Sequence, residues 1–242
     1  MTKPRSTRSP RLTRLIWLAC ALACRAIAPA QAASEIVLHN FLSPGKGANP
    51  ETGVIRDSAG NLYGTTKSGG RRNAGVVYKL DTSGRETVLH SFTSGADGGG
   101  PIAGVIRDSA GNLYGTTFYG GAANGGVVYK LDTAGHEIVL YNFTGGADGS
   151  QPDAGVIRDS AGNLYGTTYL GGAANAGVVY KLDPSGHETV LYSFTGGADG
   201  GYPGATPGLP QGLPLRRSDP RLGRQPIRNY SQRRHGERRR RV

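Results

Sequence analysis

Apolar residues occur along this chain in short runs that are bounded by glycine-rich stretches. In GVVYKLD, which begins at Gly75, and in ETVLHSF, Glu86–Phe92, apolar side chains alternate in part with polar ones. Short runs that are rich in Val, Tyr, Phe and Thr are typical of β-strands, and no window keeps the period of an amphipathic helix. The pattern therefore predicts an all-β protein.

The runs recur at a fixed spacing. The segment GVIRDSAGNLYGTT begins at Gly53, Gly104 and Gly155, so each copy follows the previous one by 51 residues. The second and third units agree at 41 of 51 positions. Self-similarity of this kind indicates stacked supersecondary units. The three units span residues 53–103, 104–154 and 155–205.

Each unit predicts four strands. After the ETVLHSF run come the short GVIRD run, then NLYGTT, then GVVYKLD. In this order the last copy of the first run, Glu188–Phe194, is an additional strand beyond three complete units. Between GVIRD and NLYGTT the segment DSAGN predicts a tight turn, in which Asp57 accepts a backbone hydrogen bond while the Gly and Asn adopt positive φ.

Four antiparallel strands every 51 residues favour a β-propeller-like blade over a solenoid coil, which has shorter repeats and fewer strands. A blade packs on both faces, which suits Val76 and Tyr78 on one face and Val77 on the other. The glycines of NLYGTT and of the GGAANAG loops suit close backbone approach near a crowded axis. About three blades fall short of the roughly four to eight of a closed propeller, so we expect an incomplete array, either a fragment or one that closes by oligomerising.

Four motifs characterise the repeats: DSAGNLYGTT, GG-x-x-N-x-GVVYKLD, G-x-ET-VLYSF and GGADG. Their combination resembles the GloVer tandem repeats of secreted bacterial proteins, from Ser34 to Ala205. The resemblance implies a propeller-like fold and a cell-surface or extracellular setting, and it brings no activity and no catalytic residues. The chain differs from the family in its few repeats and in having no recognisable anchor.

Residues 1–33 are typical of a secretory signal peptide. Five basic residues precede an apolar run, Leu15–Cys24, and small residues follow around Ala32, where we expect cleavage. The run is shorter than the ~20 apolar residues that span a bilayer. We therefore expect a secreted or cell-surface protein without a membrane-spanning segment. Because Cys20 and Cys24 lie in the signal peptide, the exported chain would have no disulfide and no thiolate metal ligand.

The formal net charge of +11 belongs to the two ends of the chain. Residues 1–33 carry six basic and no acidic side chains, and residues 216–242 carry eleven arginines against two acidic residues. The body, residues 34–215, has eleven basic and fifteen acidic side chains and is mildly acidic. Because recognition of phosphates needs a basic surface, we expect no nucleic-acid partner.

The basic tail, residues 206–242, is explained by a shifted reading frame. When the codons from Asp219 to Val242 are regrouped by one nucleotide, the degeneracy of the code permits the repeat residues Ile157–Tyr180 at 21 of 24 positions. We interpret the tail as a frameshifted fourth repeat that follows the repeats of residues 34–205. Because it is rich in Pro and Arg and poor in apolar residues, we expect it to be disordered.

Two repeated residue sets are candidates for ligand binding. The first set is the aspartate of each GGADG-type loop, which reads SGADG in the first repeat: Asp97, Asp148 and Asp199. These could hold calcium, although one carboxylate per loop is few for that ion, and the alternative is a turn cap. The second set is the tyrosine of each NLYGTT run: Tyr63, Tyr114 and Tyr165. These could form an aromatic sugar-binding surface, and the alternative is core packing.

No motif predicts a catalytic residue, a metal site or a cofactor. The distinctive polar residues are present in triplicate, whereas a catalytic site needs different side chains that converge once. The sequence favours an exported, non-enzymatic repeat protein for binding or display at the cell surface, with a glycan or a protein as ligand. Two alternatives remain, a fragment of a propeller-type polysaccharide lyase or hydrolase and the product of a frameshifted, degraded gene. Open blade edges also predict self-association.

Overall fold

The computed structural model describes residues 35–41 and 45–204. The chain divides into two units, residues 1–37 and 38–242, and only the last three residues of the first unit are described. The expected signal peptide, residues 1–33, and the tail interpreted as a frameshifted repeat, residues 206–242, lie outside the described residues. In the described part of the chain, no helix has the length and hydropathy that crossing a bilayer needs.

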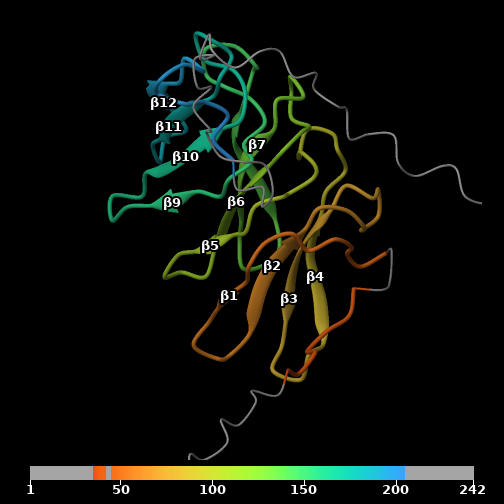
Figure 1. Cartoon of the computed structure of the whole chain (residues 1–242). Coiled ribbons are helices and arrows are strands. Elements are labelled where there is room, and N and C mark those ends of the chain that lie inside the picture. The colour runs from red at the N-terminus through yellow and green to blue at the C-terminus, as the bar shows by residue number, and fades with distance from the viewer. Residues whose placement is uncertain (1–34, 42–44, 205–242) are drawn as a thin grey trace, which may run out of the picture. The chain divides into compact units, whose positions relative to one another are not determined.

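Within the described residues, twelve strands form three four-stranded antiparallel sheets, one for each repeat (Figure 1). The first sheet contains β1 (Ile55–Arg56), β2 (Leu62–Thr66), β3 (Val76–Leu80) and β4 (Glu86–Ser91). The second contains β5 (Ile106–Arg107), β6 (Leu113–Thr117), β7 (Val127–Leu131) and β8 (Glu137–Asn142). The third contains β9 (Ile157–Arg158), β10 (Leu164–Thr168), β11 (Val178–Leu182) and β12 (Glu188–Ser193). The predicted all-β, β-propeller-like fold with four strands per repeat is confirmed.

The strands of each sheet lie in chain order, which corrects the expected grouping. The ETVL run is the last strand of its own sheet, because β12 pairs with β11. Residues Glu188–Ser193 therefore complete the third sheet and are not an additional strand. The tight turn between β11 and β12 explains this order: the backbone N–H of Gly186 bonds to the carbonyl of Asp183 (3.0 Å), and such a short connection joins neighbouring antiparallel strands.

The first and second sheets pack on both faces, as the alternation along the third strand predicts. Val76, Tyr78 and Leu80 form one buried cluster, against which Phe41 packs. Val77 points to the opposite face and joins the core between the first and second sheets. The core between the second and third sheets repeats this arrangement. Most of the hydrophobic core therefore lies between consecutive sheets.

The glycine of each LYGTT strand makes room for a tyrosine ring of the same sheet. Gly64 pairs with Tyr78 across β2 and β3. A Cβ atom at Gly64 would lie 2.6 Å from the Tyr78 hydroxyl oxygen, and the corresponding distance from Gly115 to Tyr129 is 2.5 Å. These glycines therefore serve cross-strand packing against a tyrosine ring, and not the close backbone approach near an axis that the sequence pattern favoured.

The DSAGN turn has the predicted aspartate cap but a different role for its asparagine. The Asp57 carboxylate accepts the backbone N–H of Asn61 at 2.8 Å. Gly60 has a φ of 88°, as expected, whereas Asn61 does not adopt positive φ. Its side-chain amide instead donates to Asp57 at 2.8 Å. The asparagine with positive φ is in the next loop, where Asn73 has a φ of 56°.

The paired glycines of the GGAANAG-type loops confirm the expected close backbone approach. A Cβ atom at Gly120 would lie 2.5 Å from the Cα atom of Gly98, which belongs to the preceding repeat. Beside this contact, Gly99 and Tyr119 form an isolated antiparallel bridge. These loops therefore connect the backbones of consecutive repeats at one end of the sheets.

Candidate functional site

The tyrosine of each LYGTT strand is tied to the turn that precedes it. The Tyr63 hydroxyl donates to the Asp57 carboxylate at 3.0 Å. The hydrogen bonds from Asn61 are the main cause of the low Asp57 pKa, about 2. Burial and the neighbouring carboxylate raise the pKa of the Tyr63 phenol. Tyr114 and Tyr165 make the same 3.0 Å bond to their own aspartates.

The next repeat covers the ring of two of these tyrosines. The Arg107 guanidinium carbon lies 5.8 Å from the centre of the Tyr63 ring, and that of Arg158 lies 5.7 Å from Tyr114. A cation over an aromatic face is attractive by up to ~1–2 kcal/mol. Within the described residues, Tyr165 has no such arginine. The structure therefore places Tyr63 and Tyr114 at boundaries between sheets, where an arginine already occupies the ring face that a sugar would need.

The aspartate of each GGADG loop holds its own turn. The Asp97 carboxylate accepts the backbone N–H of Thr93 at 2.9 Å and the Thr93 hydroxyl at 2.5 Å. Asp148 and Asp199 make the equivalent bonds to Thr144 and Thr195. Within residues 35–41 and 45–204, no group of three or more His, Cys, Asp or Glu side chains is arranged to hold a metal ion. Each of these carboxylates is thus engaged within its own loop.

Each boundary between sheets also partly buries a glutamate that the sequence pattern did not single out. Burial raises the pKa of Glu137 to about 7, and the nearby Asp97 charge adds to this effect. The Oε1 atom of Glu137 and the hydroxyl of Tyr129 are buried without a hydrogen-bond partner among the described residues. Only their place in the sequence could have indicated this, because each glutamate is the first residue of a strand that packs at a boundary between sheets.

A histidine replaces tyrosine at one of these boundaries. Tyr141 of the second repeat donates to Asp148 at 3.1 Å. In the first repeat the same position is His90, whose Nε2 lies 3.5 Å from Asp97 Oδ2. Burial lowers the pKa of His90, and the Asp97 charge counteracts part of this shift. His90 therefore differs chemically from its counterparts while it keeps their aspartate partner.

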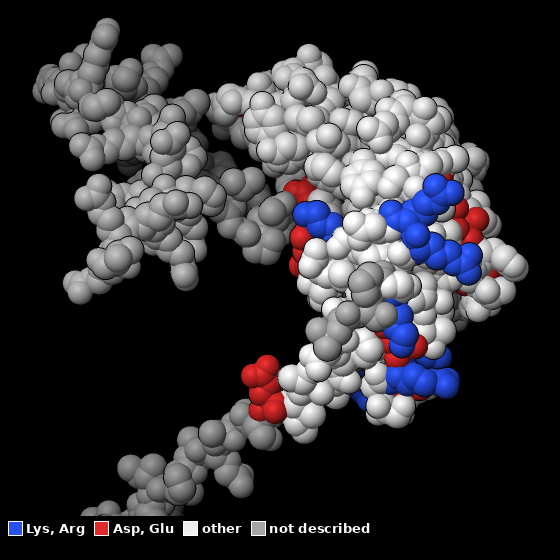
Figure 2. All heavy atoms as spheres, turned by 90° about the vertical axis from the view of Figure 1, so that its right-hand side faces the viewer, with Lys and Arg blue, Asp and Glu red and all other residues white. Residues whose placement is uncertain are grey.

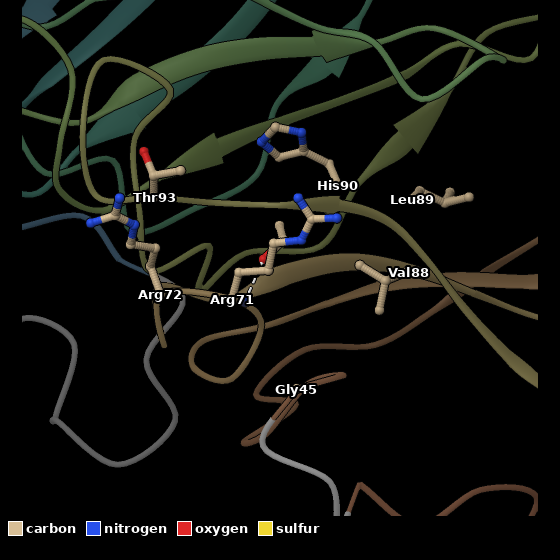
Figure 3. Close-up of a pocket in the computed structure, with 8 residues that line it drawn as sticks. Gly45, Arg71, Arg72, Val88, Leu89, His90 and Thr93 are labelled. Atoms are coloured by element: carbon tan, nitrogen blue, oxygen red, sulfur yellow. Dashed lines mark hydrogen bonds between the residues drawn. The ribbon is translucent and has the colours of Figure 1, made fainter.

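His90 also lines a pocket on the first sheet, with a cavity volume of about 740 Å³. The described lining residues are Gly45, Arg71, Arg72, Val88, Leu89, His90, Ser91 and Thr93. Figure 3 shows Arg71 and Arg72 extending from the loop between β2 and β3 towards the segment that carries His90 and Thr93. The loop is anchored there, because the Arg71 backbone N–H donates to the Ser91 hydroxyl at 2.8 Å.

This pocket is the candidate functional site, because it contains basic chemistry that the other repeats lack. The second and third repeats have Ala122–Ala123 and Ala173–Ala174 in place of Arg71 and Arg72. No Asp or Glu is among its described lining residues. Two guanidinium groups in a hollow can bind a carboxylate or a sulfate through paired hydrogen bonds. Comparison of the repeats position by position was the signal that could have revealed this site.

The pocket stands out against a surface of mixed charge. The described residues contain all eleven basic and fifteen acidic side chains of the mildly acidic body. Figure 2 shows Lys and Arg side chains with Asp and Glu beside them, next to a large area without charged residues. The arginine pair is a local feature, because the other repeats have alanines at the equivalent positions. The expectation of no nucleic-acid partner stays a prediction.

Comparison with solved structures gives proteins of similar fold at low identity. A streptogramin B lyase matches with a TM-score of 0.40 and 17% identity, over 62% of this chain and 42% of that one. A candidate gluconolactonase matches with a TM-score of 0.37 and 15% identity, over 58% and 47%. A luciferin-regenerating enzyme matches with a TM-score of 0.38 and 17% identity, over 59% and 45%. The chain spans less than half the length of each of these proteins, and similarity at this level says nothing about activity or ligand.

Comparison by sequence is more specific. No curated protein matches the chain. A family model described as the Gloeobacter/Verrucomicrobia repeat matches residues 26–213. This match covers most of the sequence and includes all three repeats, and it confirms the resemblance that the repeat motifs indicated. The chain belongs to the Gloeobacter/Verrucomicrobia repeat family.

Proposed function

We propose that this chain is an exported, non-enzymatic repeat protein that binds a ligand at the cell surface. The pocket of the first sheet is the binding site, and the ligand is a glycan or a protein that carries carboxylate or sulfate groups. One observation supports the site above all others. The repeats are closely similar, but the first repeat alone has Arg71 and Arg72 where the others have alanines, and these two arginines line the pocket.

The lining of the pocket supports binding better than catalysis. Arginine provides planar, permanently charged donors that suit carboxylates and sulfates. The lining also offers the Thr93 hydroxyl and the aliphatic side chains of Val88 and Leu89. Among its described lining residues there is no carboxylate pair for acid and base roles. These groups can bind a charged polymer, but they supply no such pair to catalyse its cleavage.

The test replaces both arginines by alanine in the full chain. Arg71→Ala with Arg72→Ala converts the loop into GGAANAG, the sequence of residues 171–177, which the same fold already contains. A matched control removes two charges elsewhere, with Arg85→Ala and Lys181→Ala. Binding is measured by titration calorimetry with polygalacturonate, a sulfated dextran, poly-glutamate and neutral dextran. We expect about a tenfold or greater loss of affinity for acidic polymers in the arginine variant and less than about twofold in the control.

The probes separate the outcomes. Preference for polygalacturonate or the sulfated dextran identifies a glycan, whereas preference for poly-glutamate identifies an acidic protein. Equal binding of neutral dextran, or an equal loss in the control variant, overturns the assignment of the pocket. Release of new reducing ends or unsaturated sugars from a bound polysaccharide overturns the non-enzymatic assignment and favours a lyase or hydrolase.

A further inference from the structure

The two boundaries between sheets repeat the same contacts. The ring centres of Phe92 and Tyr129 lie 5.1 Å apart in an edge-to-face arrangement, and Phe143 and Tyr180 repeat this at 5.1 Å. In both cases the phenylalanine follows the last strand of one sheet, and the tyrosine lies on the third strand of the next. Edge-to-face pairs contribute about 0.5–1.5 kcal/mol beyond the area that they bury. The contact therefore defines how one repeat recognises the next.

Two further contacts complete the boundary. A backbone bridge joins Ser150 of the second repeat to Leu170 of the third, with N–H to O distances of 2.9 and 3.1 Å. The valine before the first strand is also buried against the preceding sheet, since Val105 and Val156 are each 3% exposed. Ring pair, bridge and valine together form a contact set that each boundary satisfies.

A short segment before the first sheet makes part of this contact set. Phe41 lies 4.9 Å from Tyr78 between ring centres. Ala48 forms the bridge to Ser68, with hydrogen bonds of 2.8 and 3.1 Å. The segment therefore occupies the place of a preceding sheet, but it covers this sheet incompletely. Val54 is 45% exposed, in contrast to its buried counterparts in the other repeats.

The third sheet presents the other half of the contact set. Ile157 is 70% exposed and Tyr192 is 46% exposed, although the equivalent Ile106 and Tyr141 pack against the core of the second boundary. Phe194 contacts the ring of Tyr192 in its own repeat at 5.1 Å. Among the described residues, no further sheet follows β9–β12.

We infer that the open face of the third sheet docks, head to tail, onto the first sheet of a second copy of this chain. Phe194 takes the place of that copy's Phe41 against its Tyr78, and Ile157 covers its Val54. The occupant is a second copy because the first sheet carries Tyr78 and Val54. These are the tyrosine and valine positions that the second and third sheets use in the two boundaries already formed. The contact is heterologous, so repeated association gives rings or open chains of copies.

Arginine pairing supports the same register. At the two existing boundaries the arginine of one repeat lies over the tyrosine of the preceding repeat. Arg56 of the first sheet is exposed, and Tyr165 of the third sheet lacks an arginine within the described residues. Head-to-tail docking brings these two residues together across two copies. The arrangement needs no contact that the chain does not already make between its own repeats.

A disulfide trap tests the register directly. Gly201 is 51 residues after Ser150, which forms the bridge to Leu170, and Ser68 is the counterpart of Leu170 in the first repeat. Directly opposed residues in antiparallel pairs have Cα atoms about 4.5–5.5 Å apart, within reach of a disulfide. The full chain with Cys20→Ser and Cys24→Ser therefore receives Gly201→Cys and Ser68→Cys. Ser150 stands at the position of Gly201 in the second repeat, so a side chain there is compatible with the fold.

The expected result is a ladder of disulfide-linked species on a non-reducing gel that collapses to one band with reductant. A mixture of the two single variants should give one heterodimer and no longer species. The control variant, Ser150→Cys with Leu170→Cys, should form its disulfide within one chain and migrate as a monomer. Absence of the ladder at a concentration where the control is fully oxidised overturns the proposal.

A disulfide lock tests the displacement of Phe41 and Ala48. Ala48→Cys with Ser68→Cys, again with Cys20→Ser and Cys24→Ser, fixes the native bridge of the first sheet. Sedimentation velocity over a concentration series should show self-association of the reduced protein. After oxidation, the apparent dissociation constant should rise by about tenfold or more. Association that is equally strong with the lock closed overturns the proposal, as does a monomer at every concentration in both states.

Discussion

The second and third sheets have identical sequences in three of their four strands, but their environments differ. Strands β5, β6 and β7 have the same residues as β9, β10 and β11. Tyr114 of the second sheet is 8% exposed, and an arginine of the third sheet covers its ring. The isoleucine of the first strand is half-buried in the second sheet, as Ile106, but 70% exposed in the third, as Ile157. The sequence of a repeat therefore specifies its sheet, whereas a neighbouring repeat determines how much of that sheet is buried.

This difference indicates where the stability of the array resides. In a repeat protein, stability is approximately the sum of the terms of single repeats and of the boundaries between them. Phe143 is fully buried at such a boundary, whereas the equivalent Phe194 is only half-buried. The same side chain should therefore contribute very different amounts in the two repeats.

The largest expected effect separates these two phenylalanines. Phe143→Ala removes a fully buried ring that contacts Tyr180, and should lower the free energy of unfolding by about 3–5 kcal/mol. Phe194→Ala is the matched control, with an expected loss below about 1 kcal/mol. Urea denaturation of both variants, at a concentration where the chain is monomeric, measures the difference. Equal losses would contradict the comparison, because they would require an equally buried environment at the third sheet.

A smaller effect tests a contact within one sheet, between Gly115 and Tyr129, in which no neighbouring repeat takes part. Gly115→Ala places a Cβ atom 2.5 Å from the hydroxyl oxygen of Tyr129, and such overpacking costs about 1–3 kcal/mol. Tyr129→Phe removes that oxygen, so the double variant should recover part of the loss. Gly53→Ala is the control, since nothing lies within 4 Å of a Cβ atom there. Denaturation of the two single variants and the double variant gives a coupling energy, and additive losses would refute the contact.

The sequence predicted most of the fold because the fold repeats. Alternation along GVVYKLD indicated the two buried faces of the third strand, and both faces are buried in the first sheet. The grouping of strands could not be predicted in the same way. A periodic sequence can be divided at any point of its period, and only the pairing of β12 with β11 shows where a sheet ends.

The candidate site was harder to predict, for a related physical reason. Repeated residues attract attention, and the repeated Asp97 and Tyr63 proved to be engaged with groups of their own chain. Arg71 and Arg72 occur in one repeat only, so comparison of the repeats can single them out, but it does not show whether they lie at a pocket. The pocket that they line with His90 depends on which loops meet in space, and the residue pattern does not contain that information.

The smallest effect compares the buried glutamates as a function of pH. Glu137 has a folded-state pKa of about 7, above the unfolded value of about 4.3. The associated stability is complete below pH ~4.3 and is lost as the pH rises towards 7, since the unfolded chain releases the proton first. Glu137→Gln removes the titrating carboxyl group. After allowance for solvent screening of a half-buried group, the wild type should lose about 1–2 kcal/mol more than the variant between pH 4.5 and 7.5. The pKa of Glu188 is also raised, at the more exposed third sheet, so Glu188→Gln should change the pH dependence of stability less. Parallel pH profiles for Glu137→Gln and the wild type would refute the burial of Glu137 between the first two sheets.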